Sequence, residues 1–178
     1  MIVITTRLMA LALLLAAGAT AHAAGHAHVH GIAKVDVAVE ARRLSVQLEM
    51  PLDNLLGFER APRTDAERKA TDAALARLRA AAQMFAIDPT AQCGVANVEL
   101  NSAALKLGSP DPQEEADGHA DIDASFEFAC VDAAKAGFID VGLFEFARLQ
   151  RLEVQVATPR GQFRRDLQRP ARRISLVK

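Results

Sequence analysis

Apolar side chains occupy every second position on both sides of a short polar turn at Ala41-Arg42-Arg43. A period of two is that of a strand with one face buried, so the residues before and after the turn predict an antiparallel β-hairpin. Pro51 closes the second strand because it has no amide donor. The alternating apolar residues are Val35, Val37, Val39, Leu44, Val46, Leu48 and Met50.

One principal helix is expected after this hairpin. Thr64 and Glu67 have the spacing of a capping box, and apolar residues recur at helical spacing through Phe85. Asp88-Pro89 stops a helix because proline lacks an amide proton and restricts the residue before it. The predicted helix therefore covers about 65–86.

Further alternating runs predict more antiparallel strands, at 121–128 and 152–156, and the arginine-rich residues 163–176 are expected to add one or two edge strands. Residues 108–118 contain two prolines and four acids, and we expect them to form an acidic loop. A chain of 178 residues has enough apolar material for one core. The expected fold class is α+β and β-rich, with antiparallel, sandwich-like sheets and one principal helix.

The first 23 residues have the features of a secretory signal. Arg7 precedes an apolar run, 8–17, that is too short to span a bilayer, and Ala21-His22-Ala23 supplies small residues for signal peptidase. Residues 1–23 are therefore predicted to be a signal peptide, cleaved after Ala23 or Ala24, and an uncleaved membrane anchor is the alternative. Residues 24–178 are expected to form a single periplasmic domain that does not insert into the membrane.

Export also bears on the cysteines, Cys93 and Cys130. In an oxidising compartment, a well-separated pair forms a disulfide far more often than a metal or redox motif. The predicted disulfide would stabilise the fold by roughly 3 kcal/mol in the chain-entropy model.

Composition lowers the expectation for two classes of ligand. The formal charge is -1, which gives no electrostatic reason to expect nucleic acid or an anionic membrane as a partner. Tryptophan and tyrosine are absent, so base-stacking and sugar-stacking surfaces have few residues to form them.

Histidines cluster in two places: His26, His28 and His30 lie within five residues, and His119 lies beside Asp117 and Asp121. Imidazole and carboxylate groups are common zinc ligands. Residues two apart on an extended chain project to the same side, so each cluster contains a pair of ligands. The predicted Zn²⁺ site consists of His28, His30, His119 and Asp121, with His26 and Asp117 as further candidates.

This site requires two strand starts to lie side by side at one end of a sheet, open to solvent. The parity of both ligand pairs matches the polar positions of the strands that follow, so both pairs are expected to face away from the core. The alternative interpretation is a solvated N-terminal tail and an ordinary loop histidine, with no metal bound.

Several short motifs occur in an order that a known family shares. They are His28-Val29-His30-Gly31-Ile32-Ala33, Gly57-Phe58-Glu59, Ala61-Pro62-Arg63-Thr64, Cys93, His119-Ala120-Asp121, Cys130, Leu143-Phe144 and Thr158-Pro159-Arg160-Gly161-Gln162. Over nearly the whole chain after the signal, they resemble the zinc-regulated periplasmic protein family (ZrgA-like), also called domain of unknown function 2796 (DUF2796). The resemblance implies a zinc-binding protein that assists an ABC zinc importer, through contact with the importer's periplasmic zinc-binding protein. It implies the same two ligand pairs and the same disulfide.

The chain departs from that family in two places. Many relatives have a long histidine-rich insertion where this chain has the acidic loop 108–118, so a single zinc site is expected here in place of high-capacity zinc collection. Relatives also tend to have histidine at the position of Arg60, and we assign no metal role to this residue.

Three other functions remain open at this stage. Cleavage after Ala23 would leave Ala24-Gly25-His26 as an N-terminal motif that binds Cu(II) or Ni(II) in a square plane. A zinc hydrolase is disfavoured because the sequence lacks H-E-x-x-H, so we expect no enzyme activity. The third alternative is a periplasmic interaction module that binds no metal.

Overall fold

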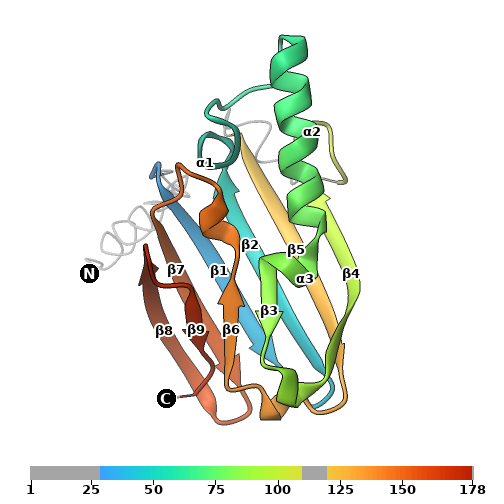
Figure 1. Cartoon of the computed structure of the whole chain (residues 1–178), viewed down its shortest axis with the longest axis vertical. Helices are drawn as coiled ribbons and strands as arrows, with labels where there is room; N and C mark the ends of the chain where they lie inside the picture. The colour runs from blue at the N-terminus through green and yellow to red at the C-terminus, as the bar shows by residue number, and fades with distance from the viewer. Residues whose placement is uncertain (1–28, 110–119, 178) are drawn as a thin grey trace, which may run out of the picture.

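The computed structural model describes residues 29–109 and 120–177, which form two sheets and several helices. The six-stranded sheet has the order β4-β5-β2-β1-β7-β8, and the three-stranded sheet has the order β3-β6-β9 (Figure 1). The elements are β1 (Ile32–Val39), β2 (Arg43–Pro51), α1 (Leu52–Leu56), α2 (Asp65–Arg79), α3 (Ala81–Met84), β3 (Phe85–Ile87), η1 (Pro89–Ala91), β4 (Cys93–Asn101), β5 (Asp121–Cys130), η2 (Ala133–Lys135), β6 (Phe138–Val141), η3 (Leu143–Glu145), β7 (Arg151–Thr158), β8 (Gly161–Gln168) and β9 (Arg173–Ser175).

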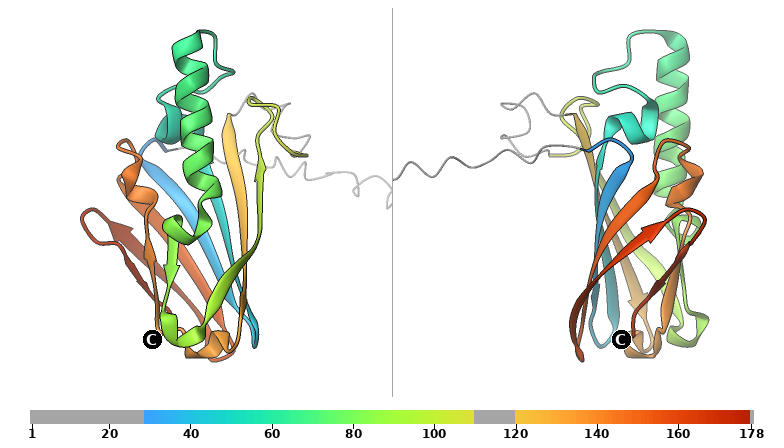
Figure 2. Two further views of the ribbon diagram at one scale, coloured as in Figure 1. Left: turned by 45° about the vertical axis from the view of Figure 1, so that its right-hand side comes forward. Right: turned by 90° about the vertical axis from the view of Figure 1, so that its left-hand side faces the viewer.

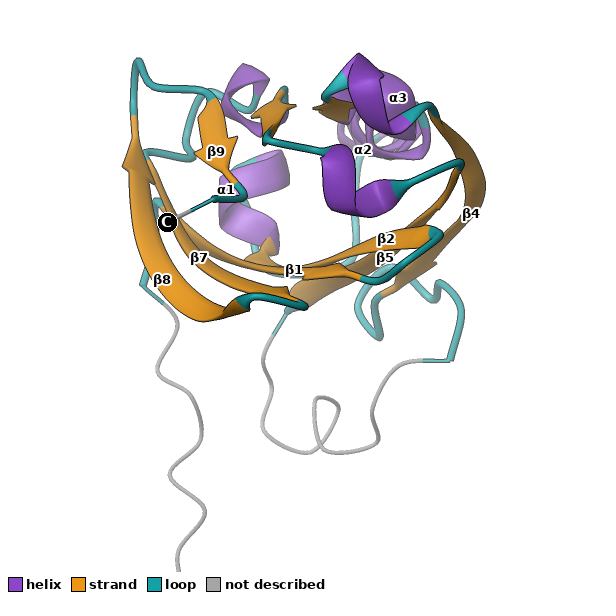
Figure 3. Ribbon diagram, turned by 90° about the horizontal axis from the view of Figure 1, so that it is seen from below, coloured by secondary structure: helices purple, strands orange, loops and turns teal. Residues whose placement is uncertain are grey.

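The core lies between the two sheets. The large sheet curves, and α2, α3 and the small sheet cover its concave face (Figures 2 and 3). Alternate residues of the large sheet point into this space, and Val35, Val46 and Phe126 are fully buried. Across the layers, the rings of Phe85 and Phe126 lie 4.8 Å apart between centroids. The predicted fold class, α+β and β-rich, is confirmed.

The predicted hairpin forms with the expected register. β1 and β2 are antiparallel, and Val37 lies opposite Val46. On its other side, β1 pairs in parallel with β7, where Ile32 lies opposite Arg151. The alternation of apolar residues indicates which face of a strand is buried, but it does not specify the neighbouring strand or its direction.

The helix expected at 65–86 is shorter in the structure. α2 ends at Arg79, and after a break at Ala80 the short helix α3 leads into β3 at Phe85. The reason is tertiary: Phe85 pairs with Val141 of β6 in an extended conformation that a continuous helix would prevent. Among the residues that the structure describes, no helix is both long enough and apolar enough to cross a membrane.

The capping box that begins α2 is confirmed. The side chain of Thr64 accepts a hydrogen bond from the amide of Glu67, and the Glu67 carboxylate accepts from the amides of Thr64 and Arg63. Arg60 adds a bidentate ion pair, with nitrogen–oxygen distances of 2.7 and 3.0 Å. Hydrogen bonds from Arg60 first, and then from these amides, lower the pKa of Glu67 from 4.5 to about 2.

We expect this lowered pKa to make the start of α2 sensitive to acid. A carboxylate whose pKa falls on folding stabilises the native state above its unfolded pKa, and that contribution is lost as the pH falls toward the folded pKa. The contribution of Glu67 should therefore disappear between about pH 5 and pH 2. Urea unfolding across this range should show a smaller decrease in stability for Glu67→Gln than for the parent protein, and equal decreases would contradict this account.

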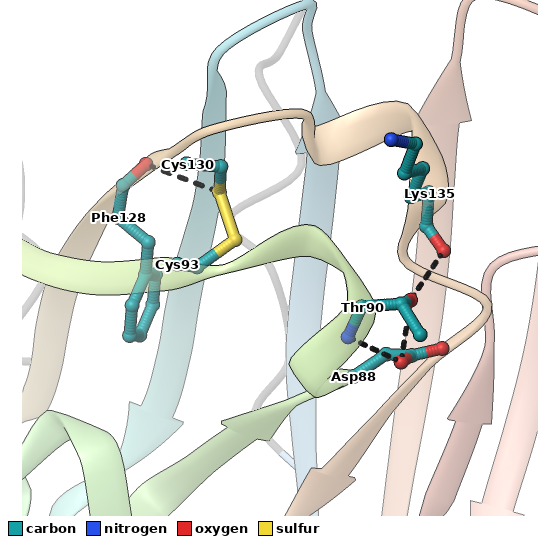
Figure 4. Close-up of a disulfide and its surroundings, with 6 residues drawn as sticks. All are labelled: Asp88, Thr90, Cys93, Phe128, Cys130 and Lys135. Atoms are coloured by element: carbon teal, nitrogen blue, oxygen red, sulfur yellow. Dashed lines mark hydrogen bonds between the residues drawn. A yellow bond between two sulfur atoms is a disulfide. The ribbon is translucent and has the colours of Figure 1, made fainter.

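The predicted disulfide joins Cys93 at the start of β4 to Cys130 at the end of β5 (Figure 4). Next to it, the turn at η1 is held by Thr90, whose hydroxyl donates to the carboxylate of Asp88 and contacts the carbonyl of Lys135. Because β5 starts at Asp121, the disulfide lies at the end of the sheet opposite that residue.

Candidate metal site

Two of the predicted zinc ligands, His30 and Asp121, are among the described residues. His28, His119, His26 and Asp117 lie outside them. His30 is in the turn just before β1, and Asp121 is the first residue of β5. The structure therefore places one residue from each predicted pair.

The two segments approach the same end of the large sheet. β1 and β5 are both antiparallel to β2, so they run in the same direction and start at the same end. The sequence predicts that these starts lie side by side, whereas the structure places β2 between them, because the hairpin pairs β2 with β1 and β5 with its free edge. Two strand spacings correspond to about 10 Å between their backbones.

The short helix α1 connects to both segments. Its first amide, from Leu52, donates to the carbonyl of Ala120 at 2.8 Å. Its buried Asn54 accepts from the amide of Gly31 at 2.6 Å and donates to the carbonyl of Ile32 at 2.7 Å. Asn54 is 1% exposed, so both bonds are shielded from water. α1 therefore holds the backbone after His30 and the backbone before Asp121 in fixed positions.

The ring of His30 lies between two carboxylates. Its Nε2 is 3.0 Å from Oε1 of Glu59, and its Nδ1 is 3.8 Å from Oδ2 of Asp53. The His30 side chain is 62% exposed, which leaves the ring accessible to solvent and to an ion. Gly31, with a φ of 82°, is in the left-handed region that favours glycine and turns the chain from His30 into β1.

Asp53 also contacts a cation. Arg148 Nη1 lies 3.4 Å from each carboxylate oxygen of Asp53, and its side chain is 58% exposed, compared with 15% for Asp53. Gly57, at the end of α1, makes room for the guanidinium, because a Cβ there would lie 3.0 Å from Arg148 Nε.

Glu59 precedes Arg60, whose side chain pairs with Glu67 of α2. Beside it, the guanidinium of Arg60 lies 4.8 Å from the ring centroid of Phe58 and forms the bidentate ion pair with Glu67 described above. Arg60 therefore joins the segment that contains Phe58 and Glu59 to the start of α2. The capping network of α2 helps to place Glu59 beside His30.

Asp121 differs from His30 in its exposure. It lies on the face of β5 opposite the core, as its parity predicts, yet it is only 7% exposed. Its backbone carbonyl accepts a hydrogen bond of 2.6 Å from the buried hydroxyl of Ser102.

The donor set beside His30 suits zinc in chemical type, since imidazole nitrogen and carboxylate oxygen are both common ligands. Within residues 29–109 and 120–177, no group of three or more His, Cys, Asp or Glu side chains is arranged to hold a metal ion. A site at this end of the sheet would therefore need donors besides these side chains.

Sequence reasoning missed Asp53, Asn54 and Arg148. The hairpin itself gave a signal for Asp53 and Asn54. A hairpin returns the chain to the end of the sheet where it began, so polar residues directly after its second strand lie near the residues directly before its first strand. Arg148 had no comparable signal, because the parallel pairing of β7 with β1 was not predicted.

A comparison with known protein families gives one match. The model of the ZrgA family, described as zinc uptake proteins, matches residues 27–176. The chain belongs to the ZrgA family. This match confirms the resemblance found in the sequence and connects the protein with zinc uptake. No protein of curated function matches the chain.

Proposed function

We propose that this ZrgA-family protein is exported to the periplasm, binds zinc there and assists zinc uptake by an ABC importer. The observation that carries this proposal is the accessible His30 ring between two carboxylates, in a chain that matches a zinc uptake family over residues 27–176. The proposed role is binding and delivery of zinc without catalysis.

Two features support the periplasmic location. Residues 1–23 have the order of charge, apolar run and small residues that signal peptidase requires. The Cys93–Cys130 disulfide is typical of an oxidising compartment. The proposed partner is the periplasmic zinc-binding protein of the importer, which would receive or supply the ion.

Calorimetry tests the proposed function directly. The protein, purified without a histidine tag, is expected to bind one zinc ion per chain with a dissociation constant that is micromolar or lower. Copper and nickel should be titrated in competition, because imidazole ligands also bind these metals. Absence of zinc binding in this range would contradict the proposal and favour an interaction module. Copper or nickel binding that depends on a free Ala24 terminus would favour the N-terminal motif.

A further inference from the structure

The contacts of the His30 ring indicate which of its two nitrogens carries a proton. A carboxylate can only accept hydrogen bonds, so the contact with Glu59 requires a proton on Nε2 of His30. A neutral imidazole has only one such proton, and Nδ1 then presents a lone pair toward the carboxylate oxygen of Asp53. At 3.8 Å, these two atoms are too far apart for a hydrogen bond.

A divalent cation can accept lone pairs from Nδ1 of His30 and from the Asp53 carboxylate at the same time. Zinc binds histidine nitrogen and carboxylate oxygen at about 2.0 to 2.2 Å, so two ligands of one tetrahedral ion lie about 3.4 Å apart. The separation of His30 Nδ1 and Asp53 Oδ2 is 3.8 Å, which a small rotation of either side chain would reduce to this value. Both residues are attached to backbone that the buried Asn54 holds in place.

Arg148 is the natural competitor for this position. Its guanidinium is 3.4 Å from both oxygens of Asp53, and it would repel a second cation there. Because the Arg148 side chain is 58% exposed, it can turn into solvent at little cost when an ion binds.

The geometry points to Asp53 as a zinc ligand that acts together with Nδ1 of His30, with Glu59 orienting the ring and Arg148 competing with the ion for Asp53. This inference rests on the proposed zinc-binding function and names residues that act in it. Glu59 is a positioning residue, comparable to the carboxylates that hold metal-bound histidines in one tautomer. The other coordination positions remain available to water or to further donors.

The test is zinc calorimetry on the untagged full-length mature protein and its variants. Asp53→Asn keeps the shape of the side chain but weakens the ligand, and it should lower zinc affinity by about 100-fold, since loss of an outer carboxylate alone costs about 10- to 100-fold. Arg148→Gln should raise the affinity by about threefold, the size of a partly exposed ion pair. Asp140→Asn is the matched control, because Asp140 also pairs with an arginine, Arg173, but on the small sheet.

A second readout identifies the coordinating atom. In ¹⁵N NMR of the imidazoles, zinc should shift the Nδ1 signal of His30 and leave Nε2 protonated. If the parent protein binds zinc but Asp53→Asn binds it equally well, or if the Nε2 signal shifts instead, the inference is overturned while the proposed function stands. If the parent protein binds no zinc, both are overturned.

Discussion

Loss of the Cys93–Cys130 disulfide is expected to lower the free energy of unfolding by about 3 to 4 kcal/mol. The bond closes a loop with a sequence separation of 37 residues, and in the chain-entropy model opening it increases the freedom of the unfolded chain. It also joins β4, an edge strand, to β5. Urea unfolding of the Cys93→Ser/Cys130→Ser variant, compared with the oxidised parent, measures the difference.

Zinc affinity of the same variant serves as a control. The disulfide and His30 lie at opposite ends of the large sheet, so zinc affinity at low temperature, where the variant remains folded, should be unchanged. A loss of stability below about 1 kcal/mol would show that the bond adds little to the fold. A large loss of zinc affinity in the folded variant would show that the two ends are coupled, against this account.

The strands could be predicted from sequence where one face is buried and the other is exposed to solvent. β1, β2, β5 and β7 show this pattern, and their alternation in sequence matches their alternation in burial. The capping box at Thr64 was also predictable, because its hydrogen bonds are local. Such features depend on residues that are close in sequence.

The remaining elements depend on contacts between distant segments. β3 and β6 have only three and four residues, too few for a clear period, and their pairing decides where the helix must end. The position of Arg148 beside Asp53 depends on the parallel pairing of β7 with β1. None of these contacts leaves a local pattern in the sequence.

The structure bears on only part of the predicted zinc site, because His30 and Asp121 are the two main predicted ligands that it describes. The histidine spacing predicts a metal site, and the antiparallel pairing of β1 and β5 with β2 brings the starts of β1 and β5 to one end of the sheet. The insertion of β2 and α1 between them was not foreseen, and this insertion is what places Asp53 next to His30. Carboxylates from the intervening segment therefore enter the site as candidates.

Replacement of either His28 or His119 by alanine is expected to lower zinc affinity by about 100-fold or more, because loss of a direct ligand should cost at least as much as loss of an outer one. If both histidines bind the same ion, the losses of zinc affinity from the two replacements cannot be independent. The first replacement already removes a ligand that the second one depends on. The His28→Ala/His119→Ala variant should then lose far less than the about 10,000-fold that two independent effects would give. Gln162→Ala, an exposed change on β8, is the control and should have no effect.

This double-mutant cycle, measured by zinc calorimetry, tests most directly whether the segments that contain His28 and His119 hold one ion. The account predicts one zinc per chain, a large loss in each single variant and a combined loss well below the product of the two. Additive losses, two zinc ions per chain, or an unchanged affinity in His119→Ala would contradict it.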